Sequence, residues 1–222
     1  GWAAFSGMAD VVVVLYLLLI PAMSVMLGGA ATASPYAGVG LSREMVTVIS
    51  CELPLVLVLL AVGKAVGGDS VTFSFSAISA WQLENGSLIT HAGLIPAALA
   101  MLLVIPGETG SHPFDTAEAE TEICEGLLAE YSGGPLAVYK LSHAVKLLTM
   151  SSLFVALFLG GVGTGIIALD AVILFALCTV IVAIFVSLVH AVTARLKIEQ
   201  VFKYYWTVVT ALAAISLVLV WY

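Results

Sequence analysis

The stretch ETGSHPFDTAEAETEICEGLLAEYSGG, residues 108–134, differs sharply from the apolar sequence on either side of it. The nearest Lys or Arg residues along the chain are Lys64 and Lys140, so no basic residue lies inside the stretch. A strongly acidic segment between long apolar runs predicts a polar connection at one face of a membrane. The stretch holds seven of the 14 acidic residues in the chain: Glu108, Asp115, Glu118, Glu120, Glu122, Glu125 and Glu130.

The composition of the rest of the chain is that of a membrane protein. Of its 222 residues, 62% are hydrophobic and only 9% are charged, so a single soluble core could not bury the apolar surface. The net charge of −7 comes largely from the acidic stretch and gives no basic surface for nucleic acid. We therefore expect the lipid bilayer to cover much of the chain, and we expect no nucleic-acid partner.

Six apolar runs are each long enough to cross a bilayer of about 30 Å, which takes about 20 helical residues. They cover residues 11–33, 45–66, 88–106, 136–160, 166–190 and 204–222. Each run is apolar on all sides, whereas the strands of a membrane barrel alternate, so helices are expected. The sequence predicts an all-α, polytopic integral membrane protein of about six transmembrane helices. Residues 1–222 form a single transmembrane domain in this interpretation, with an acidic loop or helix at 107–135.

The distribution of basic residues predicts the orientation. If successive loops alternate sides, Lys64 is the only Lys or Arg residue that falls on the face opposite the acidic segment. Because Lys and Arg favour the cytoplasmic side, the acidic segment is predicted to be cytoplasmic and both termini to lie outside the cell membrane. No basic region with a cleavage site precedes the first apolar run, so no signal peptide is expected. The basic residues on the acidic side are Arg43, Lys140, Lys146, Arg195, Lys197 and Lys203.

The spacing inside the acidic segment predicts a helix that begins near Asp115. Asp115 and Glu118 are spaced like a helix N-cap and the third helical residue. On a continuous helix, Glu120 would point away from a face shared by the other carboxylates. The members of that face would be Asp115, Glu118, Glu122, Glu125 and Glu130.

Two interpretations of the acidic segment remain open from its composition. A solvated cytoplasmic loop is the simpler one. The alternative is a segment that dips into the protein and partly shields its carboxylates from water, which the small and apolar residues between them favour. These residues are Ala117, Ala119, Ile123, Gly126, Leu127 and Leu128.

A second candidate site is Glu52, which stands alone in the second apolar run. Counted from Arg43 at about 1.5 Å per residue, Glu52 lies roughly 13 Å into the membrane. Pro54 should weaken the helix beside it. An ionisable residue at this depth costs at least about 2.5 kcal/mol, so we predict a role in a proton or ion pathway. A structural carboxylate paired with a neighbouring helix is the alternative.

Lys140, His143 and Lys146 recur every three residues in the fourth apolar run. Lys140 can reach the membrane surface by extending its side chain. Lys146 lies deeper and is a candidate partner for Glu52 or for the face of carboxylates in the acidic segment. His143 is a possible proton relay, or else a hydrogen-bonded interior histidine. No cysteine or histidine spacing is typical of a metal site, so no metal, bound cofactor or catalytic centre is expected in this chain.

Residues 112–133, HPFDTAEAETEICEGLLAEYSG, resemble the signature of the membrane subunit that joins the peripheral and membrane arms in respiratory complex I and its relatives. Residues 41–54, which include Glu52, and residues 195–206 are also similar to that family. Ser-Arg-Glu-Met at 42–45 is more similar to the group 4 energy-converting [NiFe] hydrogenases. The matching signature positions are Pro113, Phe114, Asp115, Glu118, Glu120, Glu122, Gly126, Glu130, Tyr131, Ser132 and Gly133.

The chain departs from that family pattern in two places. Relatives of full length have about eight membrane helices, and the first two, with the basic loop between them, have no counterpart here. An ungapped comparison also puts His143 where quinone-dependent members have a helix Glu. Both departures favour the hydrogenase branch over a quinone-reducing one.

The resemblance implies a coupling function. Iron–sulfur clusters and a NiFe centre would belong to soluble subunits docked on the cytoplasmic face, and antiporter-like membrane subunits would move H⁺ or Na⁺. We predict that redox change acts on the acidic segment and is passed on through Glu52, with His143, Lys146 and Glu125 as possible relays. The acidic residues in this hypothesis are Asp115, Glu118, Glu120, Glu122 and Glu130.

Three alternatives to this function remain. The chain could be the quinone-site subunit of a complex I-like NADH or coenzyme F420H2 dehydrogenase. It could be a stand-alone, proton-coupled secondary transporter, although no inverted repeat is evident. It could also be a purely structural anchor for the soluble arm.

Overall fold

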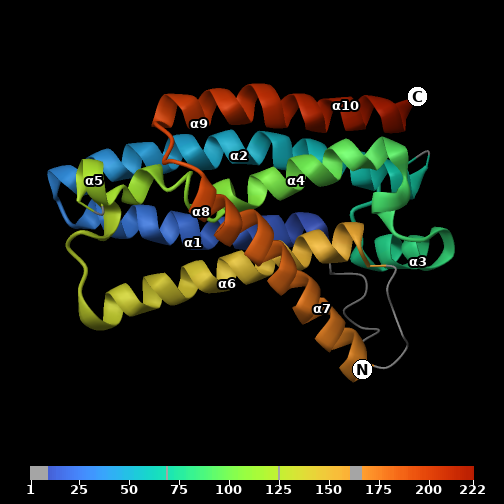
Figure 1. The fold of residues 1–222 in the computed structure, drawn as a ribbon, viewed down its shortest axis with the longest axis horizontal. Coiled ribbons are helices and arrows are strands. Elements are labelled where there is room, and N and C mark those ends of the chain that lie inside the picture. Colours follow the sequence, from blue (N-terminus) through green and yellow to red (C-terminus); the bar gives the residue numbers. More distant parts are fainter. Residues whose placement is uncertain (1–9, 69, 125, 161–166) are drawn as a thin grey trace.

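A computed structural model of the chain describes residues 10–68, 70–124, 126–160 and 167–222. These residues are helical or irregular and contain no β-strand beyond an isolated bridge between Asp10 and Ser74. The prediction of an all-α, polytopic membrane protein is confirmed. Figure 1 shows α1 (Val11–Ala31), α2 (Pro35–Gly67), α4 (Ile95–Glu108) and α6 (Gly133–Phe158) side by side in one bundle.

The last two membrane crossings are interrupted helices. The first of them joins α7 (Ile167–Ile181), the π-helical segment η5 (Val182–Leu188) and α8 (Val189–Val192). The second joins α9 (Ile198–Tyr204), the π-helical segment η6 (Tyr205–Val209) and α10 (Thr210–Trp221). In Figure 1, α9 and α10 run along the bundle, whereas α7 and α8 cross it obliquely.

Five helices among the described residues are long and apolar enough to cross a membrane. The third apolar run is shorter than predicted, because α4 is preceded by the 3₁₀ turns η1 (Leu88–Thr90) and η2 (Ala92–Leu94). Pro96 lies in the first turn of α4, where its missing N–H is tolerated, and this fixes the helix start. About six crossings therefore become five long helices and one shorter apolar helix.

The helix α2 is longer than its apolar run. It begins at Pro35, ahead of the apolar run that was predicted to start at residue 45, with Ser34 in an extended conformation before it. The polar residues Arg43 and Glu44 are therefore helical and share the axis that carries Glu52. This extension of α2 lies beside the acidic segment.

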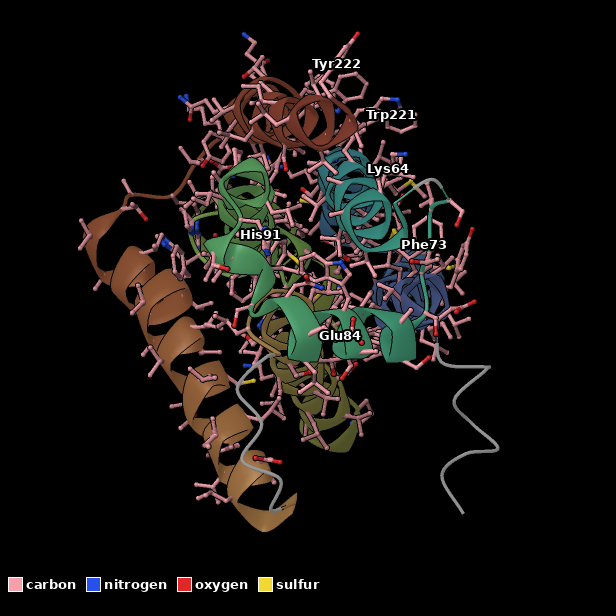
Figure 2. The ribbon with its side chains drawn as sticks, turned by 90° about the vertical axis from the view of Figure 1, so that its right-hand side faces the viewer. Lys64, Phe73, Glu84, His91, Trp221 and Tyr222 are labelled. Atoms are coloured by element: carbon pink, nitrogen blue, oxygen red, sulfur yellow. The ribbon has the colours of Figure 1, made fainter. Side chains whose placement is uncertain are left out.

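The two ends of the bundle differ in character. The acidic segment with α5 (Glu120–Ile123) lies at one end, which we call the acidic end (Figure 1). The opposite end carries the short helix α3 (Phe75–Asn85) and the C-terminus; we call it the α3 end. Figure 2 looks onto the α3 end, where Lys64 and Trp221 lie together, with the Lys64 Nζ atom 4.9 Å from the Trp221 ring centroid.

Small side chains allow close packing of α2, α4 and α10. Ala61, Ala97, Ala100 and Ala213 are completely buried where these helices meet. Close approach of helices through small residues is the usual packing mode in membranes, where no water drives association. Large apolar residues face outward on α1 and α6, including Tyr16, Leu17, Leu27, Val138 and Leu141.

The helix α3 is attached to the bundle through Gln82, whose side chain is buried. The Gln82 Nε2 atom donates to the carbonyl oxygens of Leu157, at 2.5 Å, and Ala156, at 3.3 Å. These carbonyls belong to the last turn of α6, where no following helical N–H group is available to donate to them.

We expect Gln82→Ala to lower the free energy of unfolding by about 1–3 kcal/mol, because it leaves buried helix-end carbonyls without a donor. Thermal denaturation of the purified protein in detergent measures this loss. Glu84→Ala, an exposed change on the same helix, is the matched control. Equal thermal stability of the two variants would contradict the assigned role of Gln82.

Candidate functional site

The acidic segment folds as three short pieces rather than one helix. These are the 3₁₀ turn η3 (Thr116–Glu118), the single turn α5 and the 3₁₀ turn η4 (Gly126–Leu128). The predicted continuous helix with a face of carboxylates is therefore wrong. Asp115 makes no side-chain cap, and Cys124 ends α5 in a left-handed conformation with φ 50°.

Apolar residues bury the acidic segment against the membrane helices. Gly40 of α2 permits the contact, since a Cβ atom there would lie 3.0 Å from both the Ala117 carbonyl oxygen and the Leu127 nitrogen. The burial of its small and apolar residues agrees with the second of the two interpretations, a segment that dips into the protein. The buried residues are Phe114, Ala117, Ala119, Ile123, Gly126, Leu127 and Leu128.

Arg195, between α8 and α9, forms a two-pronged ion pair with Asp115. Its Nε atom lies 3.0 Å from Oδ1 and its Nη2 atom 2.6 Å from Oδ2. The backbone N–H of Leu196 also donates to the Pro113 carbonyl. This pairing occupies both Asp115 oxygens, which explains why the residue does not cap a helix.

Arg43 joins the acidic segment to α2. Its Nη1 atom lies 2.5 Å from Glu122 Oε2 and 3.3 Å from the Thr116 carbonyl oxygen. One turn further along α2, the Thr47 hydroxyl is 3.2 Å from the Thr116 hydroxyl. The acidic segment is thus balanced by basic residues that are distant in sequence but lie at the same end of the bundle.

The most buried ion pair joins α4 to α6. Lys146 Nζ lies 3.1 Å from Glu108 Oε1, and the two side chains are only 7% and 3% exposed. The other oxygen of this carboxylate, Oε2, is buried and has no hydrogen-bond partner among the described residues. A buried carboxylate oxygen without a partner is costly, and it is able to accept a hydrogen bond from water or to bind a proton.

Glu108 lies between two cavities. The first cavity, of about 350 Å³, is at the acidic end. The second cavity, of about 300 Å³, lies deeper between α1 and α2, and Glu52 and Glu108 are its charged lining residues. Glu108 lines both, so one carboxylate separates a polar chamber from a largely apolar one. The charged and titratable lining of the first cavity includes Glu44, Glu108, Asp115, Glu118, Lys140, His143 and Lys146.

The charges around Glu108 are close enough to influence one another. Glu52 and Glu108 both line the second cavity. Glu44, Glu108 and Lys146 all line the first cavity. A change of charge at any of these carboxylates alters the field at the others.

The structure brings together some of the residues singled out in the sequence and separates others. Asp115, Glu118, His143 and Lys146 line the first cavity, and Glu52 lines the second. Lys146 pairs with Glu108, which was not a member of the predicted carboxylate face.

The remaining predicted carboxylates either do not line the two cavities or lie outside the residues that the structure describes. Glu122 and Glu130 are exposed at the outer side of the acidic segment. Glu125 and the side chain of Glu120 lie outside the described residues. The predicted roles of all these residues remain predictions.

Sequence reasoning missed two residues of this site, Glu44 and Glu108. Glu44 precedes Glu52 by eight positions, which places both carboxylates on neighbouring faces of one helix. Glu108 looked like the first residue of a polar loop, although it is the last residue of α4. Both signals were present in the sequence. Among the described residues, no group of three or more His, Cys, Asp or Glu side chains could hold a metal ion.

Comparison with known proteins gives a consistent result. Residues 3–221 match a family described as NADH dehydrogenase. Hydrogenase-4 component C of Escherichia coli (strain K12) is 39% identical over 156 residues, which are 70% of this chain and 47% of that protein. NADH-quinone oxidoreductase subunit 8 of Thermus thermophilus is 31% identical over 196 residues, 87% of this chain and 52% of that protein.

A solved structure is also similar. A chain in the membrane-bound sulfane sulfur reductase, an archaeal respiratory membrane complex, has a TM-score of 0.85 and 31% identity, covering 95% of this chain and 69% of that chain. The present chain spans about half the length of the curated relatives it matches.

The Glu108–Lys146 pair gives a testable stability difference. We expect Lys146→Met to cost about 3–5 kcal/mol, because it leaves a buried carboxylate without its cation. The double variant Glu108→Gln with Lys146→Met should recover much of that loss. Thermal unfolding of the purified protein is the measurement.

An exposed ion pair serves as the control. Glu122→Gln removes the partner of Arg43 at a side chain that is 44% exposed, and should cost only about 0–1 kcal/mol. If Lys146→Met were no more damaging than Glu122→Gln, the Glu108–Lys146 pair would not be a buried one.

Proposed function

The chain belongs to the NADH dehydrogenase family, and we propose that it is the membrane-arm coupling subunit of an ion-translocating, complex I-like oxidoreductase of the group 4 hydrogenase kind. In this proposal it anchors a soluble arm that carries iron–sulfur clusters and a NiFe centre. It links electron transfer in that arm to translocation of H⁺ or Na⁺ by neighbouring antiporter-like subunits. The observation that carries the proposal is the placement of Glu108 between two cavities.

The first step is a change of charge at the acidic end. A redox change in a docked partner would act on Asp115 and Glu118, which line the first cavity. Glu108 is the next carboxylate inward, held by Lys146 through one oxygen and unpaired at the other. The unpaired Oε2 can accept a proton without breaking a hydrogen bond, so Glu108 can switch between a charged and a neutral state.

The second step passes that change to Glu52. Glu52 shares the second cavity with Glu108, so a change of charge on Glu108 would alter the electrostatic field at Glu52. The exposed residues Tyr16 and Val56 also line this cavity, so it reaches the side of the bundle between α1 and α2. A proton on Glu52 is therefore placed to move sideways toward a neighbouring membrane subunit.

The outer surface of the acidic end supports docking of a soluble partner. Glu122 and Glu130 are exposed there, as are Lys140, Lys197 and Lys203. Such a mixed and highly charged rim suits a polar protein interface. The bias of basic residues toward this end supports the proposal that it lies on the cytoplasmic side of the cell membrane.

The similar proteins favour a subunit over a stand-alone transporter, because their names describe components of multisubunit complexes. The higher identity to a hydrogenase component, and His143 in the wall of the first cavity, support the hydrogenase branch. The similarity to an NADH-quinone oxidoreductase subunit keeps a quinone-site role as the second candidate.

We expect Glu108→Gln and Glu52→Gln to separate electron transfer from ion transport in the native complex. In membrane vesicles, ion uptake should fall by about tenfold while electron transfer is largely retained, because a neutral amide cannot carry the proton. Co-purification of the soluble subunits shows whether each variant is assembled. Glu84→Gln, at the α3 end, is the control and should leave both activities intact.

Unchanged ion uptake in both Glu108→Gln and Glu52→Gln would remove the coupling function and leave only anchoring. The branch is decided separately by assaying nickel and bound quinone in the purified native complex. Nickel without quinone supports the hydrogenase assignment. Quinone without nickel would support the alternative function, a quinone-site subunit.

A further inference from the structure

Tyr205 is a completely buried tyrosine in the first position of the π-helical segment η6. Its hydroxyl donates to the carbonyl oxygen of Leu103 in α4, at 3.0 Å. The sulfur of Cys51 on α2 lies near this hydroxyl, because both atoms would contact a Cβ atom built on Gly107. One side chain of the last crossing thus joins α2 and α4 in the interior of the bundle.

The tyrosine hydroxyl lies directly against the residue that precedes Glu108. A Cβ atom added to Gly107 would collide with the Tyr205 hydroxyl and lie 2.8 Å from the Cys51 sulfur. Gly107 therefore leaves the space into which this hydroxyl fits. The ring of Phe114, from the acidic segment, packs on Tyr205 with a centroid distance of 5.1 Å.

The last turn of α4 needs such support. Pro106 has no N–H, so the carbonyl of Leu102 has no donor four residues ahead. Gly107 contributes no side chain to hold the turn and favours helix less than other residues. The orientation of Glu108 at the end of this turn therefore depends on contacts from outside α4.

The π-helical segment determines where Tyr205 points. A π turn inserts one extra residue into the helical repeat and rotates the preceding side chains relative to those that follow. The Thr210 hydroxyl stabilises the turn by donating to the Tyr205 carbonyl oxygen at 2.7 Å. Thr210 is thus the residue that holds the widened turn from its C-terminal side.

We propose that Tyr205 is a positioning residue for Glu108. The π turn η6 places the tyrosine hydroxyl against Leu103 and Gly107. This contact holds the last turn of α4, so that Glu108 stays next to Lys146. This inference deepens the proposed function, since it rests on Glu108 being the coupling carboxylate. Its structural content, the orientation of Glu108, can be measured without any transport assay.

The test uses the native complex and the carboxyl reagent dicyclohexylcarbodiimide, which modifies protonated carboxyls in apolar surroundings. Pairing with Lys146 favours the charged form of Glu108, so the paired carboxyl should react more slowly than an unpaired one. Tyr205→Phe, which keeps the ring and removes the hydroxyl, should raise the labelling rate of Glu108 by about threefold or more, because a buried carboxylate that loses its cation takes up a proton. Labelling is quantified at Glu108 by peptide mass spectrometry.

Two further variants reach the same contact from other sides. Gly107→Ala should raise Glu108 labelling like Tyr205→Phe, because the added methyl displaces the hydroxyl. Thr210→Val should do so as well, whereas Thr210→Ser retains the stabilising hydroxyl and should behave like the unmodified chain. Tyr204→Phe is the matched control, since Tyr204 is the neighbouring half-buried tyrosine.

The outcomes separate this inference from the proposed function. Labelling of Glu108 that stays at the unmodified rate in Tyr205→Phe and Gly107→Ala overturns the positioning role, whatever the transport result. If Tyr205→Phe fails to assemble, the Thr210→Val and Thr210→Ser pair decides the question. Loss of ion uptake in Glu108→Gln with unchanged labelling in the Tyr205 and Thr210 variants would uphold the proposed function and reject Tyr205.

Discussion

Burial of the Glu108–Lys146 pair is the constraint on which the placement of the other polar groups depends. Two opposite charges inside an apolar bundle are tolerated only when they are close together and their remaining polar atoms are hydrogen-bonded. Here one oxygen of the Glu108 carboxylate pairs with Lys146, and the other has no hydrogen-bond partner among the described residues. Glu108 thus lies where a polar cavity and a largely apolar cavity meet, and at least one further carboxylate lines each of them.

The membrane helices could be predicted from sequence because a bilayer obliges the backbone to satisfy its own hydrogen bonds within each crossing. Hydropathy alone therefore located the crossings. It failed at two boundaries. Pro35 starts α2 ahead of the second apolar run, and Pro96 near the start of α4 makes the third crossing shorter than its apolar run. Both errors arise because helix boundaries are set by individual residues and not by average hydropathy.

The candidate site was only partly predictable. Glu52 and Lys146 stood out because charges are rare within apolar runs, whereas composition left open whether Leu127 and its apolar neighbours would be buried. The carboxylate face was wrong because local spacing treats Asp115 as a helix cap, whereas Arg195, 80 positions away in sequence, takes both of its oxygens. Glu108 was overlooked because it stands at the boundary where an apolar helix ends.

The second cavity has a consequence for an isolated chain in a membrane. Among the described residues, its lining beyond Glu52 and Glu108 is apolar apart from the phenol of Tyr16. This lining offers ions no chain of charged groups toward the α3 end. Under the proposed function, an isolated chain would therefore provide no charged path across the bilayer, and conduction would require a neighbouring subunit at the gap between α1 and α2.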